Sequence, residues 1–299
     1  MYLIQNMIHH KELDIAVEDI PEKVPIPSDV MDWAVYLTNE KTLLEYSHDT
    51  FMPLRPEETH TLLARMTDRF IIYVLAPTQE KLAKARQDFK DFPWAFPVLI
   101  PTTFYLESVM YSHVLQRLRE QWEHADYVGT ISYSAIEKLY DISAIYGTLH
   151  DARDKKADVA AFLYRGDSLV AAAEKWHPGF LRIWVGALRY LGFPTDQILS
   201  EQIPSFYCNY WAATPKVMKD YMQFVRVFVH TLDTLPVISD EVWNDCGYSA
   251  RGPEIAKVPS EHCMRIWGVP YYPFHPFLLE RLPCFFFHVT GKKIIASTC

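Results

Sequence analysis

Short apolar runs that alternate with amphipathic helical patterns are the feature of this sequence that most restricts its fold. Each run is rich in aliphatic and aromatic residues and is bounded by polar residues or proline, as in a β-strand. The predicted strands cover residues 2–4, 33–37, 70–75, 127–132, 159–164 and 206–212. Alternating strands and helices are typical of a mostly parallel sheet covered on both faces. We therefore expect an α/β fold with a mostly parallel central sheet flanked by helices.

The helical patterns begin and end at residues that favour helix boundaries. Predicted helices cover residues 56–69, 79–89, 103–124 and 178–191, with others starting near 135 and 215 and a last one over 276–288. Thr78 can cap the second helix, and Ser134 with Glu137 forms a capping box. One apolar stripe at four-residue spacing predicts a single long helix over 103–124: Leu106, Met110, Val114, Leu118 and Trp122. Pro283 should kink or end the last helix.

No change in composition marks a linker, so we expect a single domain. Residues 1–235 would form its core, and residues 236–299 a helical, aromatic C-terminal extension. In open α/β sheets, ligands bind beyond the carboxyl ends of the strands. The residues that follow each predicted strand are therefore the first candidates for chemistry.

Glycine is scarce, with 10 residues in 299, and this scarcity excludes two nucleotide-binding loops. The two nearest glycines, Gly247 and Gly252, are five residues apart, so a G-x-G-x-x-G turn is absent. Pro253 and Glu254 follow that pair where a P-loop has Lys and Ser or Thr. A bound nucleotide must therefore be held without a glycine-rich loop.

Charge and cysteine usage favour a soluble, cytoplasmic protein. The formal net charge of −8 argues against a nucleic-acid partner. The five cysteines are odd in number and have no C-x-x-C spacing, which indicates a reducing compartment. The N-terminal sequence lacks the charge and apolar run of a signal peptide, and the longest apolar stretch, residues 267–279, is broken by prolines. We therefore expect no transmembrane segment.

Polar side chains after the predicted strands are candidate ligand-binding residues. Gln5 and Asn6 follow the first strand and could meet a base or ribose, or form a loop with no role. Ser132 and Tyr133 end a buried strand beside a helix start, where backbone N–H groups favour phosphate. Glu107, at a helix start, either complements the helix dipole or binds sugar hydroxyls.

Two aromatic segments carry candidate sugar-binding and catalytic residues. Asn209 and Trp211 lie in an aromatic strand, where rings stack on sugars and an amide binds hydroxyls, unless the backbone satisfies that amide. His275, Glu280 and Arg281 lie in a second apolar segment. Glu280 is either a general base with a raised pKa or one half of a structural brace with Arg281.

Three segments in this order resemble glycosyltransferases of surface and capsular polysaccharide synthesis, bacterial or from large viruses, which have a GT-A-type nucleotide-diphospho-sugar transferase fold. The similarity spans roughly residues 100–288. The matching residues are Asp126, Tyr127, Gly129 and Tyr133; Asn209, Trp211, Tyr221 and Phe224; and Glu280, Arg281 and Leu282.

The resemblance implies transfer of a hexosyl or pentosyl group from a nucleotide-diphosphate donor to a glycan hydroxyl. Residues 1–235 would then be the GT-A-like nucleotide-sugar-binding and catalytic core, and residues 236–299 would complete the acceptor side. Gln5, Asn6, Ser132, Tyr133 and Arg281 would then bind the donor. Asn209, Trp211 and His275 would bind the acceptor, and Glu280 would deprotonate it if the enzyme inverts.

The sequence departs from the family at the metal motif. Most enzymes with this fold hold Mn²⁺ or Mg²⁺ with an Asp-x-Asp pair, but here the comparable strand ends in Ser132, Tyr133 and Ser134. Either other carboxylates hold the cation, or helix N-termini and cations such as Lys138, Arg265 or Arg281 neutralise the diphosphate. The alternative hypothesis is a non-catalytic carbohydrate-binding or scaffold protein with a degenerate GT-A fold.

Overall fold

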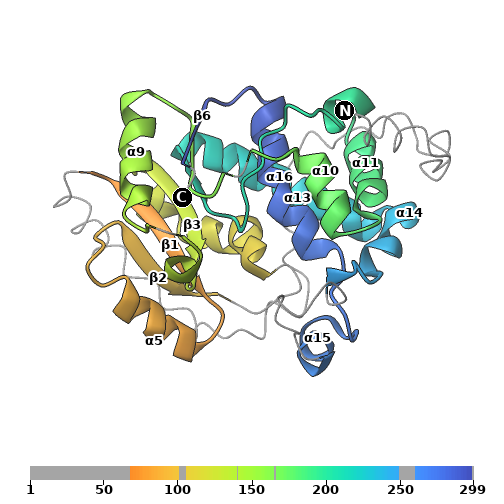
Figure 1. The fold of residues 1–299 in the computed structure, drawn as a ribbon, viewed down its shortest axis with the longest axis horizontal. Coiled ribbons are helices and arrows are strands. Elements are labelled where there is room, and N and C mark those ends of the chain that lie inside the picture. Colours follow the sequence, from red (N-terminus) through yellow and green to blue (C-terminus); the bar gives the residue numbers. More distant parts are fainter. Residues whose placement is uncertain (1–67, 101–105, 140, 165, 249–259, 298–299) are drawn as a thin grey trace.

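The computed structural model describes residues 68–100, 106–139, 141–164, 166–248 and 260–297 (Figure 1). The predicted strands over 2–4 and 33–37 lie outside these residues, as do Gln5 and Asn6. Only the last two residues of the predicted helix over 56–69 are described, and they are not helical.

A six-stranded sheet in the order β2-β1-β3-β5-β4-β6 forms the centre of the α/β fold. Its strands are β1 (Phe70–Ala76), β2 (Ala95–Leu99), β3 (Tyr127–Ser132), β4 (Val159–Ala161), β5 (Trp211–Ala213) and β6 (Ile294–Ala296). β1 is parallel to β2 and β3, and β4 is parallel to β6, whereas β5 is antiparallel to both β3 and β4. The expected mostly parallel sheet is therefore wrong: the sheet is mixed, because β5 runs back between two strands.

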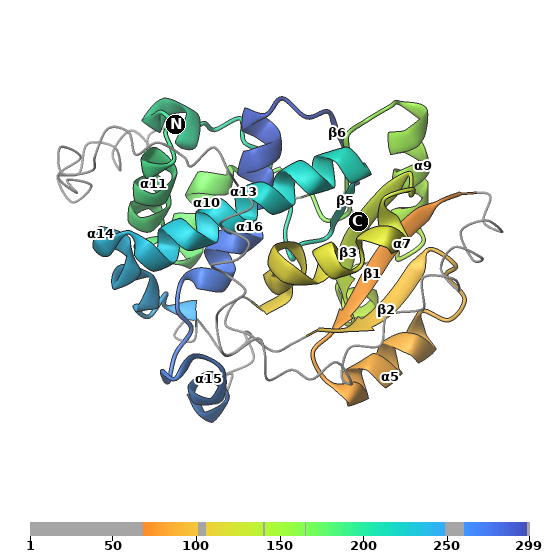
Figure 2. The same cartoon turned by 180° about the vertical axis from the view of Figure 1, so that it is seen from behind.

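Helices cover both faces of the sheet, as the alternating pattern predicts. Successive residues of β1 face opposite sides, since Phe70 packs into one core and Ile71 into the other. One core includes α5 (Gln79–Asp88), α8 (Ala135–Lys138) and α9 (Ala144–Asp154). The other includes η4 (Met110–Val114), α10 (Leu169–Trp176), α11 (Phe180–Tyr190), α13 (Pro215–Thr234) and α16 (His275–Val289). Figures 1 and 2 show β1, β2, α5 and α9 at one end of the molecule and α11 and α14 (Pro236–Ser239) at the other.

The segment expected to form one long helix over 103–124 is divided into short pieces, so this prediction is wrong. They are the 3₁₀ turn η3 (Leu106–Ser108), the π-helix η4, α6 (Leu115–Arg117) and α7 (Arg119–Trp122). The apolar stripe is buried as expected from Met110 onward. The wide π turn also lets Tyr111 face inward, and its hydroxyl lies 2.5 Å from that of Thr130 on β3.

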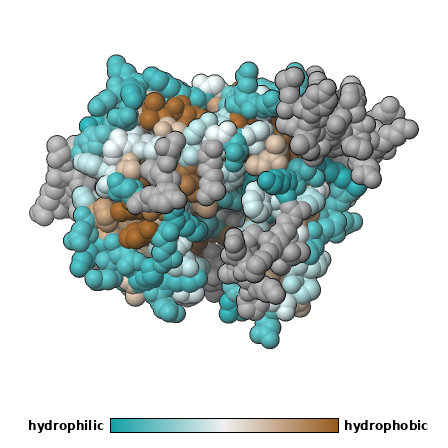
Figure 3. Space-filling model, in the orientation of Figure 1, coloured by the Kyte–Doolittle hydropathy of each residue, from teal (hydrophilic) through white to brown (hydrophobic). Residues whose placement is uncertain are grey.

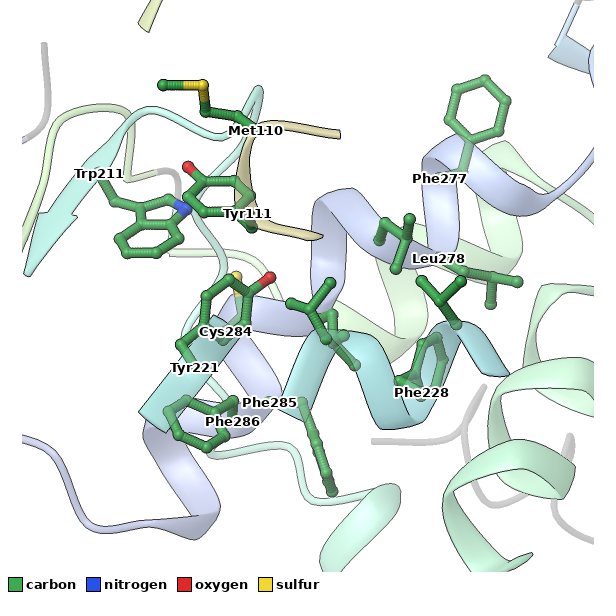
Figure 4. Packing of buried hydrophobic residues seen from close by; sticks show 14 of the residues in the cluster. Met110, Tyr111, Trp211, Tyr221, Phe228, Phe277, Leu278, Cys284, Phe285 and Phe286 are labelled. Atoms are coloured by element: carbon green, nitrogen blue, oxygen red, sulfur yellow. The ribbon is translucent and has the colours of Figure 1, made fainter. Parts of the chain in front are cut away.

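The C-terminal segment lies within the core. α16 continues through Pro283, where we expected a kink or an end. In Figure 4, Tyr111 lies against Trp211, with Tyr221 and Phe286 beyond them. The rings of Tyr111 and Trp211 stack with centroids 4.8 Å apart, and Phe286 of α16 lies 5.4 Å from Tyr221 of α13. Since β6 also pairs with β4, residues beyond 236 complete both the core and the sheet.

The remaining described elements are α12 (Thr195–Ile198), η5 (Glu241–Trp243) and α15 (Ser260–Trp267). Among the described helices, none combines the length and the apolar character that crossing a membrane requires. The face drawn in Figure 3 is largely hydrophilic, and its hydrophobic patches are small and separate.

The surroundings of two glycines lead to a stability prediction. A Cβ at Gly129 of β3 would lie 2.5 Å from Ala212 Cα and would also meet the Trp211 carbonyl, both backbone groups of β5. Gly147 of α9 is exposed and has nothing within 4 Å of such an atom. Gly129→Ala should lower the free energy of unfolding by about 3 kcal/mol or more. Gly147→Ala should raise it by about 0.5–1 kcal/mol. Urea unfolding of both variants measures these changes. Equal changes in the free energy of unfolding would contradict the close approach of β5 to β3 at Gly129.

Candidate functional site

The candidate site lies where β1 and β3 end side by side. β1 leads through α5 to β2, its neighbour in one direction along the strand order, whereas β3 leads through α8 and α9 to β4 in the other direction. A crevice that can bind a ligand forms at such a change in strand order. Thr78 caps α5 there as expected, accepting the Lys81 N–H at 3.2 Å. The Lys81 ammonium lies 4.7 Å from the ring centroid of Tyr133, which follows β3.

Hydroxyl groups form a chain at the end of β3. Ser132 Oγ lies 3.0 Å from Ser134 Oγ and is also hydrogen-bonded to the Tyr210 hydroxyl. Ser134 occupies the N-cap position of α8, but its hydroxyl caps no N–H of the helix. The predicted capping box is wrong because Ser132 binds that hydroxyl and the Glu137 carboxylate lies 3.1 Å from the Lys84 ammonium.

A strained turn precedes β5. Cys208 and Asn209 have φ of 63° and 56°, in the left-handed region, which costs roughly 1–2 kcal/mol for each residue with a side chain. The Tyr210 N–H closes the turn on the Tyr207 carbonyl at 3.1 Å. The Cys208 N–H donates to Glu280 Oε1 at 2.7 Å, so α16 holds the turn from one side.

Asn209 fastens the same turn from the other side. Its carbonyl accepts the Thr130 hydroxyl at 2.8 Å, and its amide Nδ2 donates to Ser108 Oγ at 3.2 Å. Its Oδ1 is buried and has no hydrogen-bond partner in the described part of the chain. The Ser108 hydroxyl therefore satisfies only part of this amide, and one buried acceptor is left for a donor group.

Two carboxylates and a lysine influence one another at this edge of the sheet. Glu107 is half-buried, and no described residue forms a hydrogen bond or ion pair with its carboxylate. Burial raises the pKa of Glu107, the positive charge of Lys138 opposes this, and the negative charge of Glu280 adds to it. Burial lowers the pKa of Lys138, but Tyr210, Cys208 and the two carboxylates together raise it above the usual value. Lys138 therefore stays protonated.

Tyr248 adds an aromatic wall. Its ring lies 5.2 Å from that of Tyr272 and 5.0 Å from that of Phe277. Burial raises the pKa of its phenol first, followed by the charge of Glu280. A half-buried tyrosine is therefore coupled to Glu280.

We call these residues the edge cluster, since side-chain contacts or electrostatic coupling connect them at the carboxyl edge of the sheet. Its members are Lys81, Glu107, Ser132, Tyr133, Ser134, Lys138, Cys208, Asn209, Tyr210, Tyr248 and Glu280.

Four of the residues expected to form the site belong to the edge cluster: Ser132, Tyr133, Asn209 and Glu280. Arg281, expected on the donor, is instead buried, donating to the Phe277 carbonyl at 3.1 Å and to Glu280 Oε2 at 3.2 Å. The contact between Glu280 and Arg281 is the structural brace, which is one of the two alternatives that the sequence leaves for Glu280.

Trp211 and His275, expected on the acceptor, are fully buried. Trp211 stacks on Tyr111 in the core, and the His275 ring lies 4.5 Å from that of Trp243. Neither side chain is accessible to an acceptor in this conformation.

The donor atoms at the end of β3 do not fit a divalent cation. Ser132 and Ser134 bond to each other, and hydroxyls are weaker ligands for Mg²⁺ or Mn²⁺ than carboxylates. Among the described residues, no group of three or more His, Cys, Asp or Glu side chains could hold a metal ion. We therefore derive no step through a metal.

Several edge-cluster members were not singled out as site residues from the sequence, notably Lys81, Tyr210 and Tyr248. They come from α5, the turn before β5 and the segment before residue 249, so no local motif joins them. The one available signal is position, because Lys81 lies in the first turn of the helix that follows β1.

Comparisons with known proteins identify no relative. No protein-family model matches the chain, and no curated protein or solved structure is similar to it. The function must therefore be argued from the geometry of the edge cluster.

The burial of His275 leads to a prediction about how the stability of the protein depends on pH. Burial lowers its pKa to about 3, from an ordinary value of 6.5, so the unfolded chain binds a proton that the folded protein excludes. Between these values, His275 should cost about 1.4 kcal/mol of stability for each unit of falling pH. Urea unfolding gives the free energy of unfolding at pH 7.5 and at pH 5.0. Between these two pH values it should fall by about 2 kcal/mol less in His275→Gln than in the unsubstituted protein. Equal differences would mean that His275 is accessible to protons in the folded state.

Proposed function

We propose that this protein is a GT-A-like glycosyltransferase that moves a hexosyl or pentosyl group from a nucleotide-diphosphate donor to a hydroxyl of a glycan acceptor. One observation carries the proposal: cations, hydroxyls, aromatic rings and carboxylates from five separate segments meet at the change in strand order. A nucleotide sugar needs all four kinds of group, for its diphosphate, its sugar hydroxyls, its base and the reacting acceptor.

The donor would lie across the ends of β1 and β3. Tyr133 offers a ring for stacking, and Lys81 above it offers a positive charge. Lys138 and the serine hydroxyls at the end of β3 would bind the diphosphate, whose negative charge increases as the sugar leaves. Gln5 and Asn6 stay predictions for base or ribose contacts.

The acceptor would approach from the side of Tyr248 and α16. A partly exposed aromatic ring beside carboxylates suits a sugar, whose C–H face stacks while its hydroxyls form hydrogen bonds. Tyr248 and Glu107 meet these needs better than the buried Trp211 and His275 do.

The second candidate is a non-catalytic carbohydrate-binding protein with the same fold. The hydroxyls at the end of β3 favour it, because they fit no divalent cation on a donor diphosphate. Such a protein would bind a glycan at the Tyr248 side and would turn over no nucleotide sugar.

A ligand screen separates the two candidates. UDP, GDP and dTDP and their sugars, with and without Mn²⁺, should include one that stabilises the protein by about 2.7 kcal/mol at 100 times its dissociation constant. Thermal unfolding detects the binding, and release of the nucleoside diphosphate detects turnover. If no nucleotide binds while a glycan does, the transferase proposal fails and the binding protein stands.

Lys138→Ala tests the diphosphate site. Loss of a protonated amine beside the phosphates should weaken binding of the nucleoside diphosphate about tenfold, or about 1.4 kcal/mol. Lys175→Ala, an exposed lysine on α10 outside the edge cluster, is the matched control. Isothermal titration of both variants gives the comparison, and equal affinities would place the diphosphate elsewhere.

A further inference from the structure

The two carboxylates of the edge cluster have different surroundings. Glu280 uses both oxygens within the protein: Oε1 accepts the Cys208 N–H at 2.7 Å, and Oε2 lies 3.2 Å from Arg281 Nη1. These bonds hold the turn before β5 and neutralise a buried guanidinium. If Glu280 took a proton from a substrate, both contacts would weaken, since each is strongest with an ionised carboxylate.

Glu107 is half-buried and has no such contacts with described residues. Its position is nevertheless fixed. Leu106 before it has a φ of 49°, and the hydroxyl of Ser108 after it accepts the Asn209 amide at 3.2 Å. Ser108 thus links this segment to the strained turn and holds the backbone of Glu107 beside it.

The charged and titratable groups that act on Glu107 come from each neighbouring element. Lys138 of α8 and Lys81 of α5 favour its ionised form, whereas Glu280 of α16 opposes it. The phenols of Tyr111 in η4 and Tyr210 before β5 are coupled to it as well. A carboxylate that burial makes more basic, and whose ionised form two ammonium groups favour, is suited to take up and release a proton.

We propose that Glu107 is the catalytic residue that takes the proton from the acceptor hydroxyl, and that Glu280 is a positioning residue that holds the turn of residues 207–210. This inference rests on the proposed glycosyltransferase function and names the group that acts on the acceptor.

The step is a direct displacement. The acceptor O–H proton moves to a Glu107 carboxylate oxygen while the acceptor oxygen uses a lone pair to form a bond to the anomeric carbon. The bond between that carbon and the diphosphate oxygen breaks, and its electron pair leaves with the nucleoside diphosphate. Lys138 and Lys81 balance the added negative charge, and Glu107 then loses its proton to water. The configuration at the anomeric carbon is inverted.

The test compares turnover with the donor found in the ligand screen. Glu107→Gln should lower kcat at least 100-fold, within the range that general base catalysis supplies. Its affinity for the donor should stay within twofold, and its urea unfolding midpoint should be unchanged. Glu120→Gln, an exposed carboxylate on α7 outside the edge cluster, is the matched control and should keep full activity.

The pH profile distinguishes a base from a structural residue. A general base must be ionised, so kcat should fall as the pH drops through the pKa of Glu107, which lies above its ordinary value of 4.5. Glu107→Gln should lose this acid limb, and formate should restore part of the turnover of Glu107→Ala. Glu280→Gln can still accept the Cys208 N–H but loses the ion pair with buried Arg281, so its turnover should fall while its kcat keeps the acid limb.

Four results decide the matter. If the unsubstituted protein turns over no donor, the proposed function fails and the inference with it. If the protein is active and Glu107→Gln stays within threefold of it, the function stands and the base assignment is overturned. Retention of the anomeric configuration, measured by NMR of the product, also overturns it. If Glu107→Gln does not fold, Glu107→Ala decides instead. The base assignment is overturned if formate restores none of the turnover of Glu107→Ala.

Discussion

The hydrogen bond between Glu280 and the backbone N–H of Cys208 is the contact on which much of the remaining structure depends. It secures a turn with two consecutive left-handed residues, each of which costs energy in an L-amino acid. That turn sends β5 back between β3 and β4, against their direction. The same helix, α16, supplies aromatic side chains to the core beneath, so strain at the sheet edge is offset by packing below it.

The reversed strand joins the core to the candidate site. On the core side, Trp211 of β5 stacks on Tyr111, whose hydroxyl reaches the Thr130 hydroxyl on β3. On the site side, Asn209 and Tyr210 connect the turn to Ser108 and Ser132. Because these bonds lie within a few residues of one another, the core fixes the positions of the polar groups at the edge.

Electrostatics give this edge its chemical character. Glu107 and Glu280 are partly withdrawn from water, and Lys138 lies within their influence. Coulomb interactions between such groups are stronger than on an open surface. The two glutamates thus differ in their surroundings, because Glu280 is bonded to the backbone and to a guanidinium whereas Glu107 has no such bond with a described residue.

The sequence anticipated what depends on local pattern. It placed β1 and β3 to within a residue, identified the cap at Thr78, and marked the start of α13 at Thr214 and Pro215. It failed for the helix over 103–124, because periodicity reports which residues are buried and not how the backbone winds. It also missed the reversal of β5, since an apolar run has the same composition in either direction.

By itself, then, the sequence determined an α/β chain without a glycine-rich nucleotide loop and with hydroxyls and aromatic rings after its strands. Only the tertiary structure decided which of these groups meet. Arg281 and Trp211 are buried because α16 and β5 lie in the core, whereas Glu107 is coupled to Lys81 and Glu280, and Tyr248 to Glu280, from distant segments. The physical reason is that burial and charge coupling depend on distances in space, which residue spacing along the chain does not determine.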